Sequence, residues 1–504
     1  MFPIDLVRHE NPELFIAIAA PVGADTDRVC DSLAESLVRF GYDLKPIRMI
    51  EELEQFDGRL DNEPSDEYKK IKGRMDAGDK FREDTKRNDA LALLALSRIR
   101  QVRSAAGSSD RPISRQAYLF RSLKRPEEVT ALRRIYGSNL IVIAVHAARE
   151  QRIRNLAERL ARSEYSAQSM NYRDKAEELI IRDESDETHA YGQKLRQAFG
   201  MADLFLDAGD AQRLREHLNR FLDLLFGRPV ITPSSDEVGM AHAYVAAMRS
   251  GELGRQVGAA ICDSEGRLIA IGTNEVPKAG GGHYWDGDNP DGRDWVRGFD
   301  SSDRFKITSL GELLKTLLDN KLLKKSVSAL PITEQLAKMR PLLKQTRYMQ
   351  LIEFVRAVHG EMSAIADAAA RGVSIKGGTL FVTTFPCHEC ARHIVAAGIR
   401  RVIYIEPYAK SLAIELHGDS IELDSDEDPN KIPFLPFLGV APKNHVALFS
   451  MPKRKEADGS IVPWQPITAT PRVSGSFWSY LKYETEDLGF LTDDLKKNWP
   501  RIGI

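Results

Sequence analysis

The chain has 504 residues, which is enough for two or more domains with complete hydrophobic cores. Its formal net charge is −2, so no overall basic field would draw it to nucleic acid or to an anionic membrane. It has four cysteines, no basic-then-apolar start and no apolar run long enough to span a bilayer. We therefore expect a cytoplasmic protein without a disulfide framework, signal peptide, transmembrane helix or membrane partner.

The N-terminal region alternates strand and helix patterns. Short apolar runs predict strands at residues 14–20, 42–50, 139–145 and 203–206. Helical spacing or charged helical composition follows at residues 29–40, 67–100, 148–162 and 210–226. Alternation of this kind predicts an α/β domain built on a parallel sheet.

The first predicted strand leads into residues 19–26 (AAPVGADT), the position that a phosphate-binding loop would occupy. The working motif is G-x-x-x-x-G-K-[ST], in which backbone N–H groups and the lysine hold phosphate oxygens. Here Ala19 and Ala24 replace the two glycines, Asp25 replaces the lysine, and Thr26 alone matches, with Gly23 inside the loop. A carboxylate at the lysine position predicts a degenerate loop that binds ATP poorly.

Residues 227–236 (GRPVITPSSD) are rich in proline and serine and read as a linker, which predicts domains at residues 1–228 and 236–504. A second α/β pattern follows, with a long insertion at about residues 276–350. Its expected elements are a helix at 237–249, a hairpin at 257–262 and 268–272, and strands at 379–385 and 401–405.

This second region contains one metal-site pattern. His359-Gly360-Glu361 starts a predicted helix, and Pro386-Cys387-His388-Glu389-Cys390 follows a predicted strand. One imidazole and two thiolates are three suitable zinc ligands that leave a fourth position open, and helix N-termini favour the thiolates. Glu361 would serve as the proton shuttle in the H-x-E…P-C-x-x-C pattern of zinc nucleobase deaminases. The alternatives are half of a structural zinc knuckle, although no second C-x-x-C exists, and a redox dithiol, which would not need the H-x-E.

Several segments together resemble deoxycytidylate deaminases. They are QVGA at 256–259, GTN at 272–274, HGEMSAI at 359–365, TTFPCHEC at 383–390 and the stretch CARHIVAAGIRRVIYIEPY at 390–408. The resemblance covers most of residues 249–408 apart from the insertion, and implies zinc-dependent hydrolysis of a deoxycytidine nucleotide. It also implies that Asn274 binds the substrate sugar; a turn-forming asparagine at a strand end is the alternative. Gly360 departs from the usual alanine of that family.

Residues 140–162 and 179–187 (LIIRDESDE) resemble the arginine-rich lid of nucleoside monophosphate kinases; an ordinary exposed basic helix is the alternative. The combination of an N-terminal half of this kind with a deaminase-like half resembles the bacterial antiphage dCTP/dCMP deaminases, as do the segments GTNEVPKAGGGHYW and EPYAKSLAIELHGDSI. This resemblance covers nearly the whole chain. That resemblance implies a P-loop-kinase-like parallel-sheet domain, regulatory or structural, fused to a cytidine-deaminase-like α/β/α domain. It implies depletion of dCTP during phage infection, and control by a small RNA or another regulator such as a nucleotide. We also expect a homo-oligomer.

Four further residues are candidate substrate contacts. Arg255, Lys278 and Lys410 are candidate phosphate ligands, and each could equally be a solvated surface charge. Trp285 follows three consecutive glycines and is expected to help cover the nucleotide; a connector to the helices of the insertion is the alternative.

Three functions therefore remain open from the sequence. The first is deamination of dCMP and dCTP to dUMP and dUTP. The second is a deaminase acting on tRNA or single-stranded DNA, which would want a basic groove with stacking aromatic side chains. The third is a nucleotide- or RNA-sensing module with a vestigial zinc site, against which the retained Glu361 argues.

Overall fold

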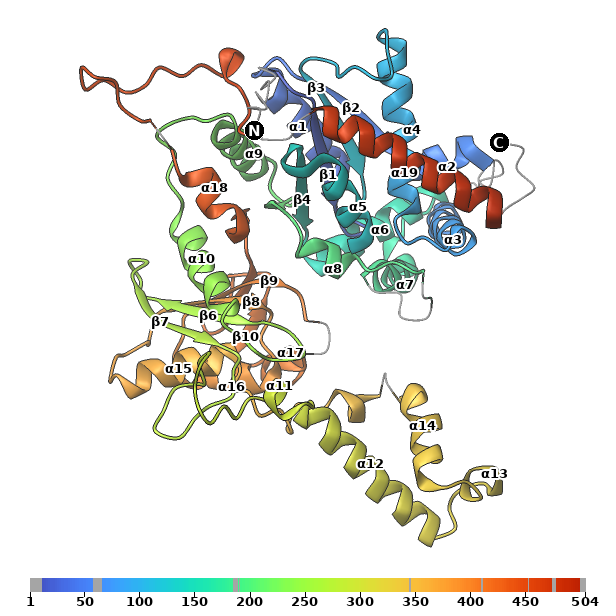
Figure 1. The fold of residues 1–504 in the computed structure, drawn as a ribbon, viewed down its shortest axis with the longest axis vertical. Helices are drawn as coiled ribbons and strands as arrows, with labels where there is room; N and C mark the ends of the chain where they lie inside the picture. The colour runs from blue at the N-terminus through green and yellow to red at the C-terminus, as the bar shows by residue number, and fades with distance from the viewer. Residues whose placement is uncertain are drawn as a thin grey trace, which may run out of the picture. The chain divides into compact units, whose positions relative to one another are not determined.

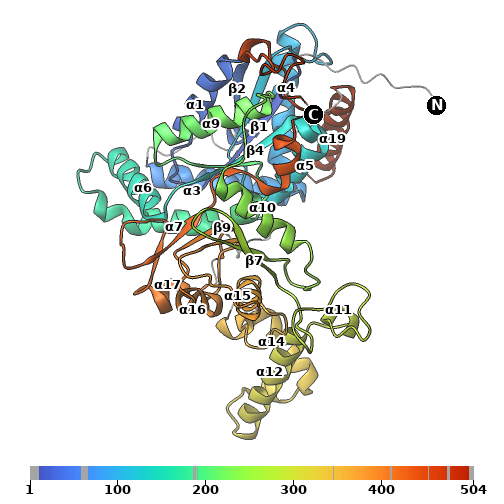
Figure 2. The same ribbon diagram turned by 90° about the vertical axis from the view of Figure 1, so that its left-hand side faces the viewer.

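The computed structural model describes residues 11–57, 66–184, 189, 191–343, 346–408, 411–451, 453–473 and 477–498. The chain divides into two compact units, one from the described parts of Met1–Glu237 and Leu438–Ile504 and the other from Val238–Phe437. Figures 1 and 2 show their elements. None of the described helices combines the length and the apolarity that crossing a membrane requires.

The first unit is built on a six-stranded sheet in the order β12-β5-β4-β1-β3-β2. All neighbouring pairs are parallel except β12 with β5. Its central strands are buried on both faces, as parallel strands covered by helices must be. The strands are β1 (Leu14–Ala19), β2 (Asp43–Arg48), β3 (Gln116–Arg121), β4 (Leu140–His146), β5 (Leu204–Asp207) and β12 (Gly439–Val440).

Helices surround this sheet and close its core. They are α1 (Thr26–Val38), α2 (Met49–Asp57), α3 (Glu67–Thr85), α4 (Ala90–Ala105), α5 (Pro126–Tyr136), α6 (Arg149–Ser163), α7 (Arg173–Glu184), α8 (Leu195–Phe199), α9 (Ala211–Leu225), α18 (His445–Phe449) and α19 (Phe477–Asn498). The parallel α/β sheet predicted for this region is confirmed. The single charged helix expected at residues 67–100 is two helices, because the chain turns left-handed at Lys86. Strand β3 was not predicted.

The described residues from Leu438 onward belong to the first unit. The second unit therefore ends at Phe437, whereas the sequence predicted a second domain that continues to residue 504. Figure 1 shows α19, in red, beside α3 and α4, and the residue contacts agree. The link is a buried ion cluster. Arg103 of α4 donates hydrogen bonds of 2.8 Å to Glu13 Oε2 and 2.5 Å to Glu484 Oε2, and all three side chains are almost completely buried. Because an unpaired charge there would be costly, the cluster holds α19 against the unit.

The second unit is built on another six-stranded sheet, in the order β10-β11-β9-β8-β6-β7. Strand β6 is antiparallel to both β7 and β8, and the remaining pairs are parallel. The predicted hairpin and the two predicted strands after it are confirmed. The strands are β6 (Gly258–Cys262), β7 (Leu268–Thr273), β8 (Thr379–Thr384), β9 (Arg401–Glu406), β10 (Ile421–Leu423) and β11 (Ile432–Pro436).

Two glycines allow helices to approach both faces of this sheet closely. A Cβ atom on Gly272 of β7 would lie 2.1 Å from the carbonyl oxygen of Gly360, at the start of α15 (Gly360–Ala370). A Cβ atom on Gly258 of β6 would lie 2.0 Å from the carbonyl oxygen of Ala243 in α10 (Ser235–Ala247). Gly258 pairs with Thr273 and so faces opposite to Gly272, because side chains alternate along a strand. The unit is therefore an α/β/α sandwich.

The other helices of the second unit lie around the site or in the insertion. They are α11 (Asp294–Arg297), α12 (Ser301–Asp319), α13 (Lys325–Ser328), α14 (Ile332–Leu343), α16 (His388–Ala396) and α17 (Ala413–His417). In the insertion, α12 and α14 pack against each other (Figure 2). Backbone hydrogen bonds between Glu275 and Val358 join the points where the insertion leaves and rejoins the sheet.

We predict that Gly272→Ala destabilises the second unit, because the added methyl group would overlap the backbone of α15. Overpacking of this kind costs roughly 1–3 kcal/mol in the free energy of unfolding, which chemical denaturation would measure. Gly311→Ala in α12 is the matched control: its Cβ would lie 3.9 Å from Leu336, and alanine is favoured over glycine in a helix. A Gly272→Ala protein as stable as wild type would contradict this account of the packing.

Candidate metal centre and active site

Two helix starts position the metal-ligating side chains. His359 is the residue before α15, and Cys387 is the residue before α16, with Cys390 in the first turn of α16. The Cys387 sulfur accepts a hydrogen bond of 3.5 Å from the backbone N–H of Cys390. Unpaired N–H groups at a helix start favour negative charge, so both sulfurs lie where thiolates are stabilised.

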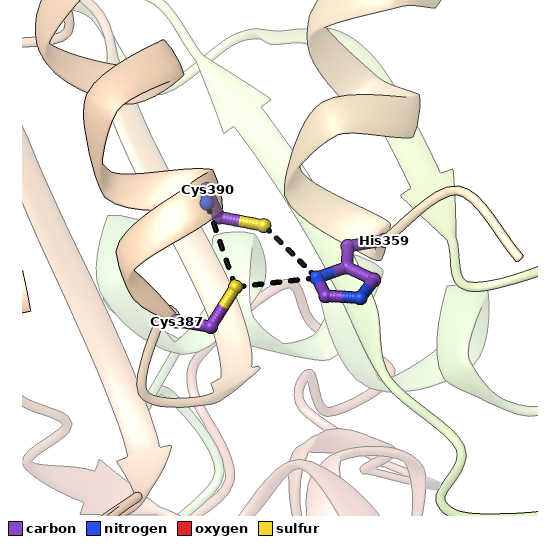
Figure 3. Close-up of side chains that lie close together, drawn as sticks. All are labelled: His359, Cys387 and Cys390. Carbon is purple, nitrogen blue, oxygen red and sulfur yellow. Dashed lines mark hydrogen bonds between the residues drawn. The ribbon is translucent and has the colours of Figure 1, made fainter. Parts of the chain in front are cut away.

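The three side chains converge on one point (Figure 3). Nδ1 of His359 lies 3.3 Å from Sγ of Cys387 and 3.3 Å from Sγ of Cys390. Tetrahedral zinc, with Zn–S near 2.3 Å and Zn–N near 2.0–2.1 Å, would separate a nitrogen and a sulfur ligand by about 3.6 Å. The donor atoms all lie within 4.8 Å of one another, so the set fits a zinc ion. The predicted triad is thus brought together.

The electrostatics of the metal-free triad favour a thiolate. The pKa of Cys387 is lowered to about 4, because the Cys390 thiol and the His359 imidazolium both stabilise its negative charge. The hydrogen bond to Cys387 in turn raises the pKa of His359 to about 9. The pKa of Cys390 is raised well above its usual value, since that thiol donates to the neighbouring thiolate and is buried. Binding a metal to all three ligands would therefore release protons.

Glu361 lies in the first turn of α15 and is only 4% exposed. Burial, reinforced by the nearby charge of Cys387, raises its pKa to about 7. A carboxyl group whose pKa is close to neutral can both accept and return a proton under physiological conditions. This property suits the proton-shuttle role proposed for Glu361.

Glu361, His359 and Cys387 open onto a cavity of about 310 Å³. A nucleobase-sized ligand would fit in a cavity of this class. Most of the wall comes from the loops at the ends of β6, β7 and β8 and from the segment before α15. The lining residues are Glu252, Gly254, Arg255, Val257, Asn274, Ile352, Val355, Ala357, His359, Glu361, Thr384, Phe385, Cys387 and Tyr408.

Asn274 lines this cavity, and its amide is bonded to the backbone of the neighbouring loop. Its Oδ1 accepts from the N–H of Val257 at 2.7 Å, and its Nδ2 donates to the carbonyl oxygen of Arg255 at 2.6 Å. Asn274 therefore holds the 255–257 loop in place. Each amide atom retains one hydrogen-bonding position, so contact with a substrate sugar stays a prediction.

The candidate phosphate ligands are placed differently from one another. Arg255 lines the cavity and forms an ion pair of 3.2 Å with Glu406, in which both side chains are about half exposed. Lys278 does not line the cavity; its Nζ lies 2.8 Å from Asp288 Oδ2. Lys410 lies outside the described residues.

Trp285 does not line the cavity either. The Arg249 guanidinium lies 3.6 Å from the centre of the Trp285 ring, which is otherwise 58% exposed. Its predicted role in covering a nucleotide is therefore not supported by a place on the wall, and the connector interpretation fits this position. Substrate contact by Lys278 and Trp285 stays a prediction.

Sequence reasoning missed several wall residues that the fold brings to the site. Phe385 and Tyr408 follow β8 and β9, and both belong to segments that carried the resemblance, which was a usable signal for them. Ile352, Val355 and Ala357 come from the segment that returns from the insertion. No motif marks them; only the pairing of Glu275 with Val358 places them.

The degenerate loop lies in the first unit. Asp25 is the N-cap of α1, where its side chain accepts a hydrogen bond from the N–H of Arg28. The carboxylate at the lysine position is thus used to begin the helix. Gly23 and Thr26 line a second cavity at this loop, and Thr26 Oγ1 accepts a hydrogen bond from Arg121.

Comparison with known proteins finds relatives of the second unit. Residues 233–406 match the family model described as the cytidine and deoxycytidylate deaminase zinc-binding region. The human deoxycytidylate deaminase is 27% identical over 169 residues, covering 34% of this chain and 63% of that protein. The deoxycytidylate deaminase of enterobacteria phage T4 is 44% identical over 54 residues, covering 11% of this chain and 28% of that protein.

The chain spans less than two thirds of the length of these relatives. Among solved structures, the dCMP deaminase from the cyanophage S-TIM5 in its apo form is 17% identical, with a TM-score of 0.22; the match covers 41% of this chain and all of that one. On the family model, the homology and the His359/Cys387/Cys390 triad, the second unit of this chain contains a zinc-binding domain of the cytidine and deoxycytidylate deaminase type and is homologous to deoxycytidylate deaminases.

Proposed function

We propose that the chain hydrolyses deoxycytidine nucleotides, converting dCMP and dCTP to dUMP and dUTP. One observation carries the proposal: a buried carboxyl group, Glu361, lies on the wall of the cavity onto which His359 and Cys387 also open. The homology to deoxycytidylate deaminases supports a deoxycytidine nucleotide as the substrate class.

The chemistry of the site divides between the metal and Glu361. Zinc, when bound by His359, Cys387 and Cys390, makes a water molecule acidic enough to supply hydroxide near neutral pH. Glu361 accepts the proton of the attacking water and delivers it to N3 of cytosine. A second proton passes through Glu361 to the amino group on C4, the C4–N bond breaks, and ammonia leaves as the C4 carbonyl forms.

The cavity wall offers matching surfaces for the rest of the substrate. Phe385, Val257 and Ala357 give an apolar surface for a pyrimidine ring. Among the lining residues that the structure describes, Arg255 is the one permanently charged cation, and a phosphate group would compete with Glu406 for it. In this proposal Asn274, which orders the loop carrying Arg255, contacts the sugar of the nucleotide.

The wider biology is proposed from the resemblance stated above. In it, the reaction depletes dCTP in defence against phage, the first unit is a kinase-like regulatory or structural domain, and a nucleotide or small RNA controls a homo-oligomeric enzyme. The first unit's parallel sheet and degenerate loop are compatible with that role.

The substrate class is tested by incubating zinc-loaded protein with dCMP, dCTP, CMP and a cytosine-containing single-stranded oligonucleotide, then quantifying uracil products by chromatography. We expect turnover of the deoxynucleotides and little of CMP or the oligonucleotide. Deamination of the oligonucleotide alone would replace the proposal with a polynucleotide deaminase, and no product from any substrate would favour a sensing module.

We predict that Cys387→Ala and Cys390→Ala each abolish stoichiometric zinc binding, because two remaining ligands cannot complete a tetrahedral protein site. Elemental analysis of the purified variants measures this directly. Cys262→Ala is the matched control, since Cys262 is a buried cysteine of the same unit that is not part of the triad. Full zinc occupancy in either triad variant would remove that cysteine from the metal site.

We predict that Glu361→Gln lowers turnover by at least ~10²–10⁴-fold while zinc remains bound, because glutamine keeps the size of the side chain and cannot transfer the proton. Steady-state deamination together with zinc content separates this effect from loss of the metal. Wild-type turnover in metal-replete Glu361→Gln protein would disprove the proton-shuttle role.

A further inference from the structure

Arg255 reaches the deaminase cavity from a loop whose backbone is held in place. Asn274 accepts from the N–H of Val257 and donates to the carbonyl oxygen of Arg255. Gln256 donates from Nε2 to the carbonyl oxygen of Ser250 at 2.9 Å. The position from which the Arg255 side chain extends is therefore fixed relative to β6 and β7.

Glu406, the ion-pair partner of Arg255, also has a fixed backbone. It is the last residue of β9, it pairs with Thr384 of β8, and its carbonyl oxygen accepts from the N–H of Phe385 at 2.8 Å. Thr384 and Phe385 line the cavity, whereas Glu406 is not one of the lining residues. Glu406 therefore adjoins the cavity wall without contributing to it.

The contact between these two side chains uses only part of the arginine. Nη1 of Arg255 lies 3.2 Å from Oε2 of Glu406, and Glu406 is the one hydrogen-bond partner of this guanidinium among the described residues. Since a guanidinium has five N–H donors, others remain for the oxygens of a phosphate group. The side chains are 52% and 41% exposed, and an ion pair so open to solvent is weak enough for a phosphate to compete with it.

The Glu406 carboxylate lies near the position that a phosphate on Arg255 would take. The 3.2 Å contact, the width of a guanidinium and an N–H···O bond of about 2.8 Å together place such a phosphate within roughly 8 Å of Glu406. The Debye length is about 8 Å at physiological ionic strength, so the repulsion is only partly screened. Glu252 adds a second carboxylate to the cavity wall. The repulsion grows with the negative charge of the nucleotide.

We infer that Glu406 is a specificity-determining residue that disfavours nucleotides in proportion to their phosphate charge. It competes with the phosphate for Arg255 and repels it, so that dCTP is disfavoured more than dCMP. A nucleoside, which has no phosphate, is unaffected. The inference rests on the proposed function, because it takes Arg255 as the phosphate ligand. Glu406 acts through Arg255 and through its own charge, and so is not a catalytic residue.

Calorimetry with the reaction products measures this selectivity without turnover. Zinc-loaded, full-length wild-type and Glu406→Gln proteins are titrated with deoxyuridine, dUMP and dUTP at low ionic strength and without magnesium, which would neutralise the triphosphate. We expect Glu406→Gln to bind dUMP at least about threefold more tightly than wild type, dUTP at least about tenfold more tightly, and deoxyuridine equally well. An equal change for all three ligands, no change, or weaker binding of dUMP would overturn the inference.

Steady-state kinetics separate this inference from the proposed function. The KM values for deoxycytidine, dCMP and dCTP should change in the same graded way in Glu406→Gln, with kcat unchanged. Deamination with no graded change would keep the proposed function and overturn the inference. No deamination of any substrate, together with graded product affinities, would overturn the proposed function and keep the phosphate selectivity.

Two further variants and added salt identify the cause. Glu406→Asp keeps the charge and should keep the wild-type ratio of dUMP to dUTP affinity. The matched control, Glu427→Gln, removes the same charge from an exposed glutamate of the same unit that neither lines the cavity nor pairs with Arg255, and should bind as wild type does. In about 1 M salt, where the Debye length is about 3 Å, the graded change should shrink, because screening acts on charge and not on shape. An equal effect of Glu427→Gln would assign the selectivity to net charge and overturn the inference.

Arg255→Gln tests the phosphate contact itself. It should weaken dUMP binding by about tenfold or more and leave deoxyuridine affinity unchanged, because only the phosphate group loses a partner. Unchanged dUMP affinity in this variant would remove Arg255 from the phosphate site and overturn the inference.

Discussion

The close contact between β7 and the start of α15 is the constraint on which the metal centre depends. Because Gly272 has no side chain, the first turn of α15 lies directly on the sheet, and His359 is the residue immediately before that turn. The cysteines reach the same point from α16, which begins after β8, two strands away across β6. A ligand set in which each sulfur lies 3.3 Å from the imidazole nitrogen requires both helices to be held rigidly by one sheet.

The same arrangement makes the site reactive. Helix starts favour thiolate ligands, whereas burial raises the pKa of Glu361 to about 7. Residues 359–361 thus supply both a metal ligand, His359, and the buried carboxyl group that we propose as the proton shuttle, Glu361. The long insertion does not disturb this geometry, because hydrogen bonds between Glu275 and Val358 close its two ends before the ligand His359.

The first unit depends on contacts between distant parts of the sequence. Arg103 joins Glu13, near one end of the chain, to Glu484, near the other, and Tyr480 donates to Glu13 from the same C-terminal helix. No local pattern announces such a cluster, since Glu484 is 381 residues from Arg103. For that reason the expectation of a continuous C-terminal domain to residue 504 differs from the observed units.

The sequence by itself determined the metal triad, the position of Glu361 beside it, and most strands of both sheets. These features follow from local rules: ligand spacing, helix-start chemistry and short apolar runs. Only the tertiary structure decided that Asn274 orders the Arg255 loop, that Lys278 and Trp285 lie away from the cavity wall, and that Ile352 and Val355 lie on it. Those outcomes depend on which partner each side chain meets across the fold, and such partners are set by packing between segments far apart in the chain.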